Sequence, residues 1–141
     1  MKTSPQGFTL LEIVAVLALI ALLTALVLPS LTHGARSAES RVCRDQLWRD
    51  VRALRADAIA DKRTNTLSIT DGGYILCLGG DTTRRKLPEG FSLGIVDAAA
   101  ETGEELAFGA DGSSSGASLL LTAGKSLFKL SVKEDGSFGW E

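Results

Sequence analysis

Three residues near the start of the chain have the types and spacing for a defined piece of chemistry: Gly7, Phe8 and Glu12. Cleavage of the peptide bond between Gly7 and Phe8 would leave a new α-amino group about one helical turn from the Glu12 carboxylate. Glu12 is the one ionisable residue between Phe8 and Leu28. Because a charge in an apolar environment needs a partner, we expect this carboxylate to pair with the amine of a neighbouring copy of the chain.

The apolar run from Phe8 to Leu28 is long enough to cross a membrane. A helix of this length, at about 1.5 Å per residue, matches a hydrocarbon core of about 30 Å. A secretory signal peptide fits less well, because the run is too long and no small-x-small cleavage site follows Pro29. Lys2, before the run, favours a cytoplasmic N-terminus. The sequence thus predicts one transmembrane helix over residues 8–29.

Beyond this run, small and apolar residues recur at helical spacing, which predicts that the helix continues to about Ala60. This stripe consists of Leu31, Ala35, Ala38, Val42, Leu47, Val51, Leu54 and Ala58. Charged residues occupy the other positions, and Arg41, Asp45 and Arg49 have the i, i+4 spacing of ion pairs. The mixed charges and the net charge of −2 indicate a solvated face, not a nucleic-acid-binding stripe.

From residue 62 onward the apolar period falls to two, which predicts a domain of short strands separated by Gly-rich turns. The predicted strands are Thr66–Thr70, Tyr74–Leu78, Phe91–Val96, Glu105–Phe108, Ala117–Thr122, Ser126–Val132 and Phe138–Trp140. One long helix followed by strands predicts the α+β class, with the helix packed on an antiparallel sheet.

The two cysteines, Cys43 and Cys77, allow two interpretations. On the outer side of a membrane they could form a disulfide, which would add roughly 3–4 kcal/mol in the chain-entropy model. Two buried thiols fit equally well, because a bridge requires Cα atoms within about 7 Å of each other. The sequence leaves both open.

No set of residues predicts an enzyme, a cofactor or a metal centre. An enzyme tethered by a simple anchor would need converging acids and bases, and His33 is the one His in the chain. The basic triplet Arg84–Lys86 lacks the spacing of a phosphate-binding loop. We expect the triplet to lie in a solvated loop, where it could dock on an acidic surface of another subunit. The acidic stretch 97–105 is expected to be exposed.

The stretch GFTLLE, from Gly7 to Glu12, resembles the class III signal of type IV pilins and type II secretion pseudopilins. The resemblance implies cleavage of a leader, residues 1–7, by a prepilin peptidase, followed by N-methylation of Phe8. It also implies that Glu12 neutralises the amine of an adjacent subunit. Residues 8–29 would be the anchor in the bacterial inner membrane and the filament core. Residues 30–61 would be the periplasmic half of the helix, and 62–141 a periplasmic globular domain.

The C-terminal part resembles the GspH/FimT family of minor pilins and pseudopilins. Its F-x-x-D-G-S-x-x-G loop and its final hairpin turn are matched by Phe108, Asp111, Gly112, Ser113, Gly116, Asp135, Gly136 and Gly139. The resemblance implies a structural subunit at or near the tip of a type II secretion pseudopilus. Its implied partners are the other pseudopilins, the prepilin peptidase, the inner-membrane assembly platform and secreted cargo.

Two alternatives within this class stay open. A FimT-like minor type IV pilin, for pilus assembly, adhesion or DNA uptake, shares the architecture. The acidic end at Glu141 favours secretion over DNA uptake, because phosphate contacts need Lys or Arg, so no nucleic-acid partner is expected. A major pseudopilin would bind calcium in its C-terminal loops. Asp111 and the serines after it supply too few carboxylates for that, so we expect a loop without metal.

Overall fold

The computed structural model describes residues 9–97, 102–103 and 105–141, without the side chains of 25–36, 97 and 102–103. The chain divides into two compact units, Met1–Glu39 and Ser40–Glu141. One helix, α1 (Leu10–Asp61), contributes residues to both units.

Helix α1 begins at a cap formed by Thr9. The backbone N–H of Glu12 donates to the Thr9 carbonyl oxygen at 3.0 Å and to Thr9 Oγ1 at 3.3 Å. Threonine is a favoured N-cap residue because its hydroxyl satisfies a free N–H of the first turn. Helix α1 therefore has a defined start two residues after Phe8.

No helical stretch in the part of the chain that the structure describes is long and apolar enough to cross a membrane. The predicted span of 8–29 includes residue 8 and the side chains of 25–29, which lie outside the described residues. The transmembrane helix therefore stays a prediction.

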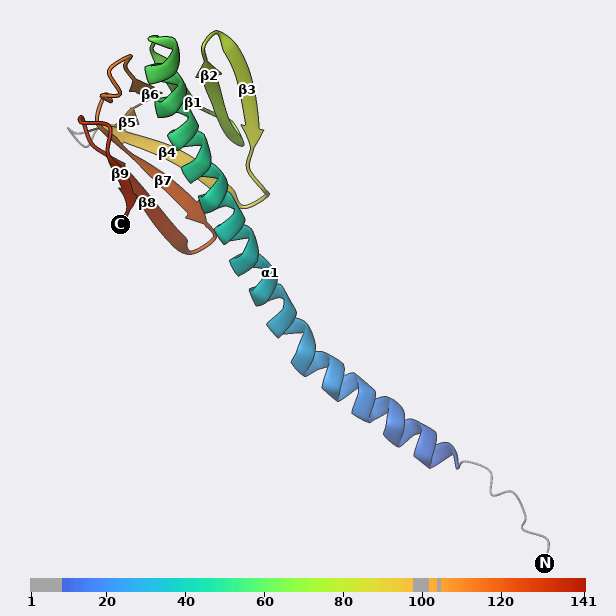
Figure 1. Cartoon of the computed structure of the whole chain (residues 1–141). Coiled ribbons are helices and arrows are strands. Elements are labelled where there is room, and N and C mark those ends of the chain that lie inside the picture. The colour runs from blue at the N-terminus through green and yellow to red at the C-terminus, as the bar shows by residue number, and fades with distance from the viewer. Residues whose placement is uncertain (1–8, 98–101, 104) are drawn as a thin grey trace, which may run out of the picture. The chain divides into compact units, whose positions relative to one another are not determined.

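Two antiparallel sheets follow the helix, with strand orders β3-β2-β1-β6 and β5-β4-β7-β8-β9 (Figure 1). The strands are β1 (Asn65–Thr70), β2 (Gly73–Leu78), β3 (Asp81–Lys86), β4 (Phe91–Asp97), β5 (Thr102–Gly103), β6 (Glu105–Phe108), β7 (Ala117–Ala123), β8 (Ser126–Val132) and β9 (Phe138–Trp140). The predicted α+β class with antiparallel strands is confirmed.

The prediction that Arg84–Lys86 lies in a loop is wrong, because these residues form the end of β3. Strand β3 is an edge strand whose side chains are mostly exposed. Exposed charges are common on edge strands, where they prevent pairing with another sheet. Its polar sequence therefore resembles that of a loop. The two-residue strand β5 was not predicted either.

The core of the globular unit lies between the second half of α1 and both sheets. Helix α1 contributes Leu47, Val51, Leu54 and Ala58, which confirms this part of the predicted stripe. The sheets contribute Leu67, Tyr74, Leu76, Leu93, Ile95, Leu106, Phe108, Ala117, Leu119, Leu121, Leu130 and Val132. Val42, also predicted on the stripe, is 66% exposed. The five-residue step between Val42 and Leu47 separates their side chains by about 140° around the helix axis. Val42 therefore points away from the sheets that Leu47 faces.

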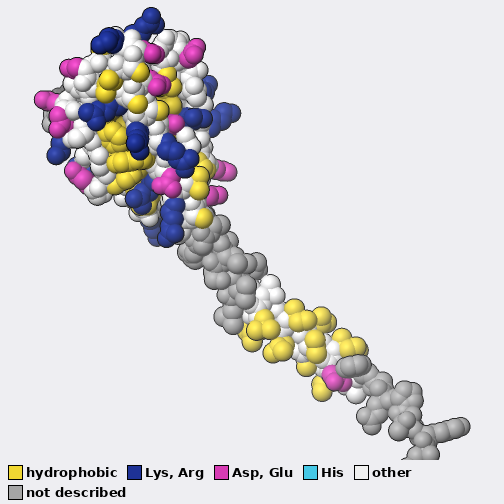
Figure 2. All heavy atoms as spheres, in the orientation of Figure 1, with side chains coloured by type: hydrophobic (Ala, Val, Ile, Leu, Met, Phe, Trp, Pro, Cys, Tyr) yellow, Lys and Arg dark blue, Asp and Glu magenta, His cyan; other side chains and the backbone are white. Residues whose placement is uncertain are grey.

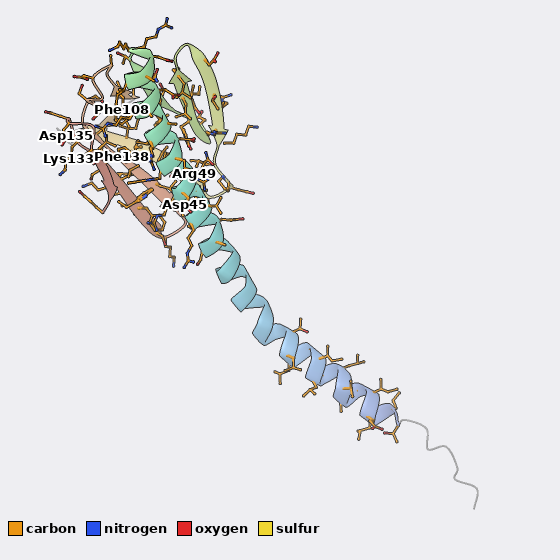
Figure 3. All side chains as sticks on the ribbon, viewed as in Figure 1. Asp45, Arg49, Phe108, Lys133, Asp135 and Phe138 are labelled. Carbon is orange, nitrogen blue, oxygen red and sulfur yellow. The ribbon has the colours of Figure 1, made fainter. Side chains whose placement is uncertain are left out.

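The i, i+4 ion pairs predicted among Arg41, Asp45 and Arg49 do not form in the described part of α1. Among the described residues, Asp45 forms no salt bridge with Arg41 or Arg49. Figure 3 shows Asp45 and Arg49 on the part of α1 that belongs to the globular unit. Exposed pairs of this kind gain little free energy and cost side-chain entropy, so correct spacing alone does not bring them together.

Candidate functional site

Two of the three predicted processing residues, Gly7 and Phe8, lie outside the described residues. Glu12 is described and is exposed in the first turn of α1. An acidic residue there is favoured by the partial positive charge of the helix N-terminus, by about 0.3–1 kcal/mol. Glu12 thus has a local role in starting the helix, in addition to its predicted pairing with another subunit. The pairing itself stays a prediction.

Arg55 of α1 connects two loops that are far apart in sequence. Its Nε donates to the carbonyl oxygen of Gly112 at 3.1 Å, and its Nη2 donates to the carbonyl oxygen of Asp135 at 3.3 Å. Gly112 lies in the loop that joins β6 of one sheet to β7 of the other, and Asp135 lies in the β8–β9 turn. Arg55 therefore fixes the crossover between the sheets to the last hairpin.

The two loops repeat the same local structure, which follows from the same three residue types. In each D-G-S sequence the Asp Oδ1 accepts hydrogen bonds from both the N–H and the hydroxyl of the Ser two residues later. These bonds from Ser113 and Ser137 hold the pKa of Asp111 and Asp135 below the ordinary aspartate value. The glycines between them, Gly112 and Gly136, adopt φ of 81° and 76°, where glycine is favoured. The family resemblance indicated the residues of these loops except Ser137, but it did not indicate the shared contact with Arg55.

A second polar cluster joins α1 to the β2–β3 hairpin. The Asp50 carboxylate is buried and accepts hydrogen bonds from Tyr74 Oη at 2.7 Å and Gln46 Nε2 at 2.9 Å. Arg85 Nε lies 3.2 Å from Asp50 Oδ2. The pKa of Tyr74 is raised, chiefly by burial and next by the hydrogen bond to Asp50. The basic triplet thus supplies one partner of a buried acid, a long-range contact that its sequence did not indicate.

Aromatic side chains gather where α1 passes the edge strand β9. Trp48 packs against Phe138 with ring centroids 4.7 Å apart. The Arg44 guanidinium lies 4.7 Å from the ring centroid of Phe128 and 4.9 Å from that of Trp140. These contacts attach the C-terminal strand to the helix.

A groove of about 560 Å³ lies beside this contact. Its lining residues are Trp48, Arg52, Arg55, Ala56, Ile59, Ser137 and Phe138. On the globular unit, Figure 2 shows yellow side chains flanked by dark-blue Lys and Arg. The groove lining combines apolar side chains with two guanidinium groups.

The two cysteines, both described, are not joined by a disulfide. Cys43 packs against the core from α1. On β2, Tyr74 and Leu76 are buried in that core, so Cys77 faces the opposite side of the sheet, because side chains alternate along a strand. There its Sγ lies 4.0 Å from Thr82 Oγ1 on β3. The alternation of β2 therefore explains why the two thiols do not meet.

Among the described residues, no three His, Cys, Asp or Glu side chains lie close enough together to hold a metal ion. The loop at Asp111, weighed above as an imitation of a calcium site, uses its carboxylate to accept hydrogen bonds from Ser113. The carbonyl oxygens of Gly112, in this loop, and of Asp135 accept hydrogen bonds from Arg55.

A scan of protein-family models finds no match to this chain. A search of curated proteins finds none either. Two solved structures are similar, both crystal forms of the type IV minor pilin FimU of Pseudomonas aeruginosa strain PAO1. One aligns with a TM-score of 0.56 and 13% identity, over 72% of this chain and 87% of FimU. The other has a TM-score of 0.51 and 17% identity, over 72% and 91%. The chain therefore has a type IV pilin-like α+β fold.

Proposed function

We propose that this chain is a minor subunit of a filament of the type IV pilin class, cleaved after Gly7 and anchored in the bacterial inner membrane by residues 8–29. One observation carries the proposal: the GFTLLE signal runs into the first turn of a 52-residue helix, and the second half of this helix packs on a β-domain similar to that of a minor pilin. Neither part suffices alone, because a short motif can occur by chance and a fold does not determine function.

In this proposal Glu12 acts during assembly. N-methylated Phe8 carries the amine, and the Glu12 carboxylate of a neighbouring subunit neutralises it within the filament core. This charge pair sets the register between subunits, because an unpaired charge in an apolar environment costs several kcal/mol. The role is structural, and no enzymatic step is assigned to the chain.

Within the class we favour the type II secretion pseudopilus, with the chain at or near the tip. Its partners would be the other pseudopilins, the prepilin peptidase, the assembly platform of the inner membrane and secreted cargo. The loop and hairpin residues of the GspH/FimT pattern fit this assignment, but the FimT-like alternative shares them. The salt bridge between Glu141 and Lys129 favours secretion over DNA uptake, because it offsets a positive charge that a phosphate could contact.

The second candidate is a minor type IV pilin for pilus assembly, adhesion or DNA uptake. The similarity to FimU, itself a type IV minor pilin, favours this candidate. Deleting the gene and restoring it separates the two. Loss of exoprotein secretion with normal pili would support the secretion role, and loss of pili with normal secretion would support the pilus role.

The filament proposal itself is tested by the mass and N-terminal sequence of the protein from membranes with and without a prepilin peptidase. We expect a chain that begins at N-methylated Phe8 only when the peptidase is present. A chain that still begins at Met1, or that is cut after residue 29, would contradict the proposal. A Glu12→Gln variant should be processed normally but fail to enter filaments, while Glu39→Gln, an exposed acid on the same helix, should enter them.

A further inference from the structure

The outer edge of β9 has backbone groups that bond to none of the described residues. Strand β9 is the last strand of its sheet and pairs with β8. The Ser137 carbonyl accepts from Lys133, and the Glu141 N–H donates to Lys129, so these groups point toward β8. Because bonding direction alternates along an antiparallel strand, the N–H and C=O of Phe138 and Trp140 point away from it. No residue that the structure describes bonds to them.

This free edge adjoins the groove beside α1. Phe138 contributes both an outward-facing backbone and a side chain that packs on Trp48 across the groove. Figure 3 shows Phe138 beside α1, and the Asp135 carbonyl oxygen accepts a hydrogen bond from Arg55 of α1. An extended segment paired with β9 would therefore place every second side chain toward α1, because directly opposite residues share a face of the sheet.

The charges on this side of α1 select an acidic segment. Arg52 is exposed and forms no hydrogen bond or ion pair with any described residue. Arg55 adds a second positive charge to the groove lining, although its N–H groups are bonded to Gly112 and Asp135. Of the acidic residues, Asp135 uses its carboxylate to accept hydrogen bonds from Ser137. Asp45 lies on the part of α1 that belongs to the globular unit. Ile59, 46% exposed, and Trp48 supply the apolar surface.

We infer that the β9 edge and the groove along α1 together bind an extended segment of a partner protein, added as a strand, with a carboxylate and an apolar side chain at alternate positions facing α1. Strand addition supplies affinity through the main chain, while pockets for alternate side chains supply specificity. The surface lies wholly in the globular unit, so the inference goes beyond the proposed filament role and does not depend on it.

The chain offers a built-in probe, because its two tryptophans, Trp48 and Trp140, both lie at this surface. The experiment titrates the full chain, in detergent micelles, with an eight-residue peptide and follows tryptophan fluorescence. The peptide has Thr at alternate positions, with Asp and Leu by turns between them. A second peptide has Lys in place of Asp. We expect the Asp peptide to bind at least about 10-fold more tightly than the Lys peptide, since like charges disfavour the wrong partner.

Two exposed arginines of α1 form a matched pair of variants. Arg52→Glu should weaken binding of the Asp peptide by about 10-fold or more and strengthen binding of the Lys peptide. Arg49→Glu makes the same change outside the groove lining and should alter affinity by less than about 2-fold. Equal effects of the two variants, no binding of the Asp peptide, or equal binding of the Lys peptide would overturn the inference. Unchanged circular dichroism would show that the variants still fold.

Strand pairing is tested separately with N-methylated peptides. Methylation at the Asp and Leu positions removes the donors that face β9 in antiparallel pairing, and methylation at the Thr positions removes those of parallel pairing. One of the two peptides should lose binding while the other keeps it. Equal loss, or no loss in either, would contradict addition to β9.

Other occupants give different results and would also overturn the inference. If a second copy of the chain fills the groove, fluorescence will change with protein concentration in the absence of peptide, and Arg52→Glu will abolish this change. If the surface binds nucleic acid, a twelve-nucleotide single-stranded DNA will displace the Asp peptide. Neither result depends on whether the chain is processed after Gly7.

Discussion

Gly136 lies so close to Gly112 that a methyl group on its Cα would overlap the Gly112 carbonyl oxygen. The same methyl group would lie 2.8 Å from Arg55 Nε. The last hairpin turn, the loop between the sheets and helix α1 thus meet at one point, and this point allows no side chain at residue 136.

Replacing Gly136 with alanine should therefore destabilise the globular unit by more than backbone strain alone. Gly124 provides the comparison, because its φ is also positive, at 60°, but no atom lies within 4 Å of a Cβ placed there. We expect Gly124→Ala to cost about 1 kcal/mol and Gly136→Ala about 3 kcal/mol or more. Urea denaturation measures both, and equal costs would contradict the close contact with Gly112.

Removing the Arg55 side chain should loosen both D-G-S loops together. Arg55→Ala deletes two hydrogen bonds from a charged donor, and we expect the free energy of unfolding to fall by about 2 kcal/mol. Arg49→Ala removes an exposed arginine from the same helix and should change it by less than about 0.5 kcal/mol.

Hydrogen exchange locates the effect of the Arg55 change. The amides of Ser113 and Ser137, one in each loop, should both lose protection in Arg55→Ala. Loss in a single loop would mean that Arg55 does not couple the two.

The hydrogen bond between Tyr74 and Asp50 predicts a pH dependence at the alkaline end. Burial and this bond raise the pKa of Tyr74 above its ordinary value of 10.0. Above about pH 10 the unfolded chain loses the phenolic proton and the folded chain keeps it, so unfolding is favoured as the pH rises. Below that pH the contribution of this group is constant.

The Tyr74→Phe variant separates this effect from that of the lysines. It should be less stable than the parent at pH 8 by about 1–2 kcal/mol, because a buried hydrogen bond is lost. Between pH 10 and about 11 its stability should fall less steeply than that of the parent. Parallel stability curves over this range, obtained by urea denaturation, would show that Tyr74 ionises equally in both states.

The position of Cys77 predicts that the chain carries two thiols. Alkylation of the unfolded, unreduced protein should label both Cys43 and Cys77, as counted by intact mass. Replacing Cys77 with alanine should change stability by less than about 1 kcal/mol, because the half-buried thiol makes one weak contact with Thr82. Labelling that requires a reductant would show a disulfide and contradict the observed face of Cys77.

Local patterns determine much of this protein. The three- and four-residue spacing of Leu47, Val51, Leu54 and Ala58 predicts the buried face of α1, and the period of two after residue 62 predicts most strands. Both signals are local, because a helix or strand must turn its apolar side chains toward one core. The G-F-x-x-x-E motif is also local, and its proposed role depends on processing and assembly outside a single chain.

Only the tertiary structure decided which distant residues meet. The sequence predicts that Arg85 is a solvated charge. In the structure β3 pairs with β2, which brings Arg85 to the buried carboxylate of Asp50. Arg55 is one of five arginines between residues 41 and 55, and of these it alone bonds to both D-G-S loops. The two loops meet there because the chain crosses from one sheet to the other after β6. The same packing separates Cys43 from Cys77. Such contacts depend on strand order and register, which arise from the whole core and not from any short segment.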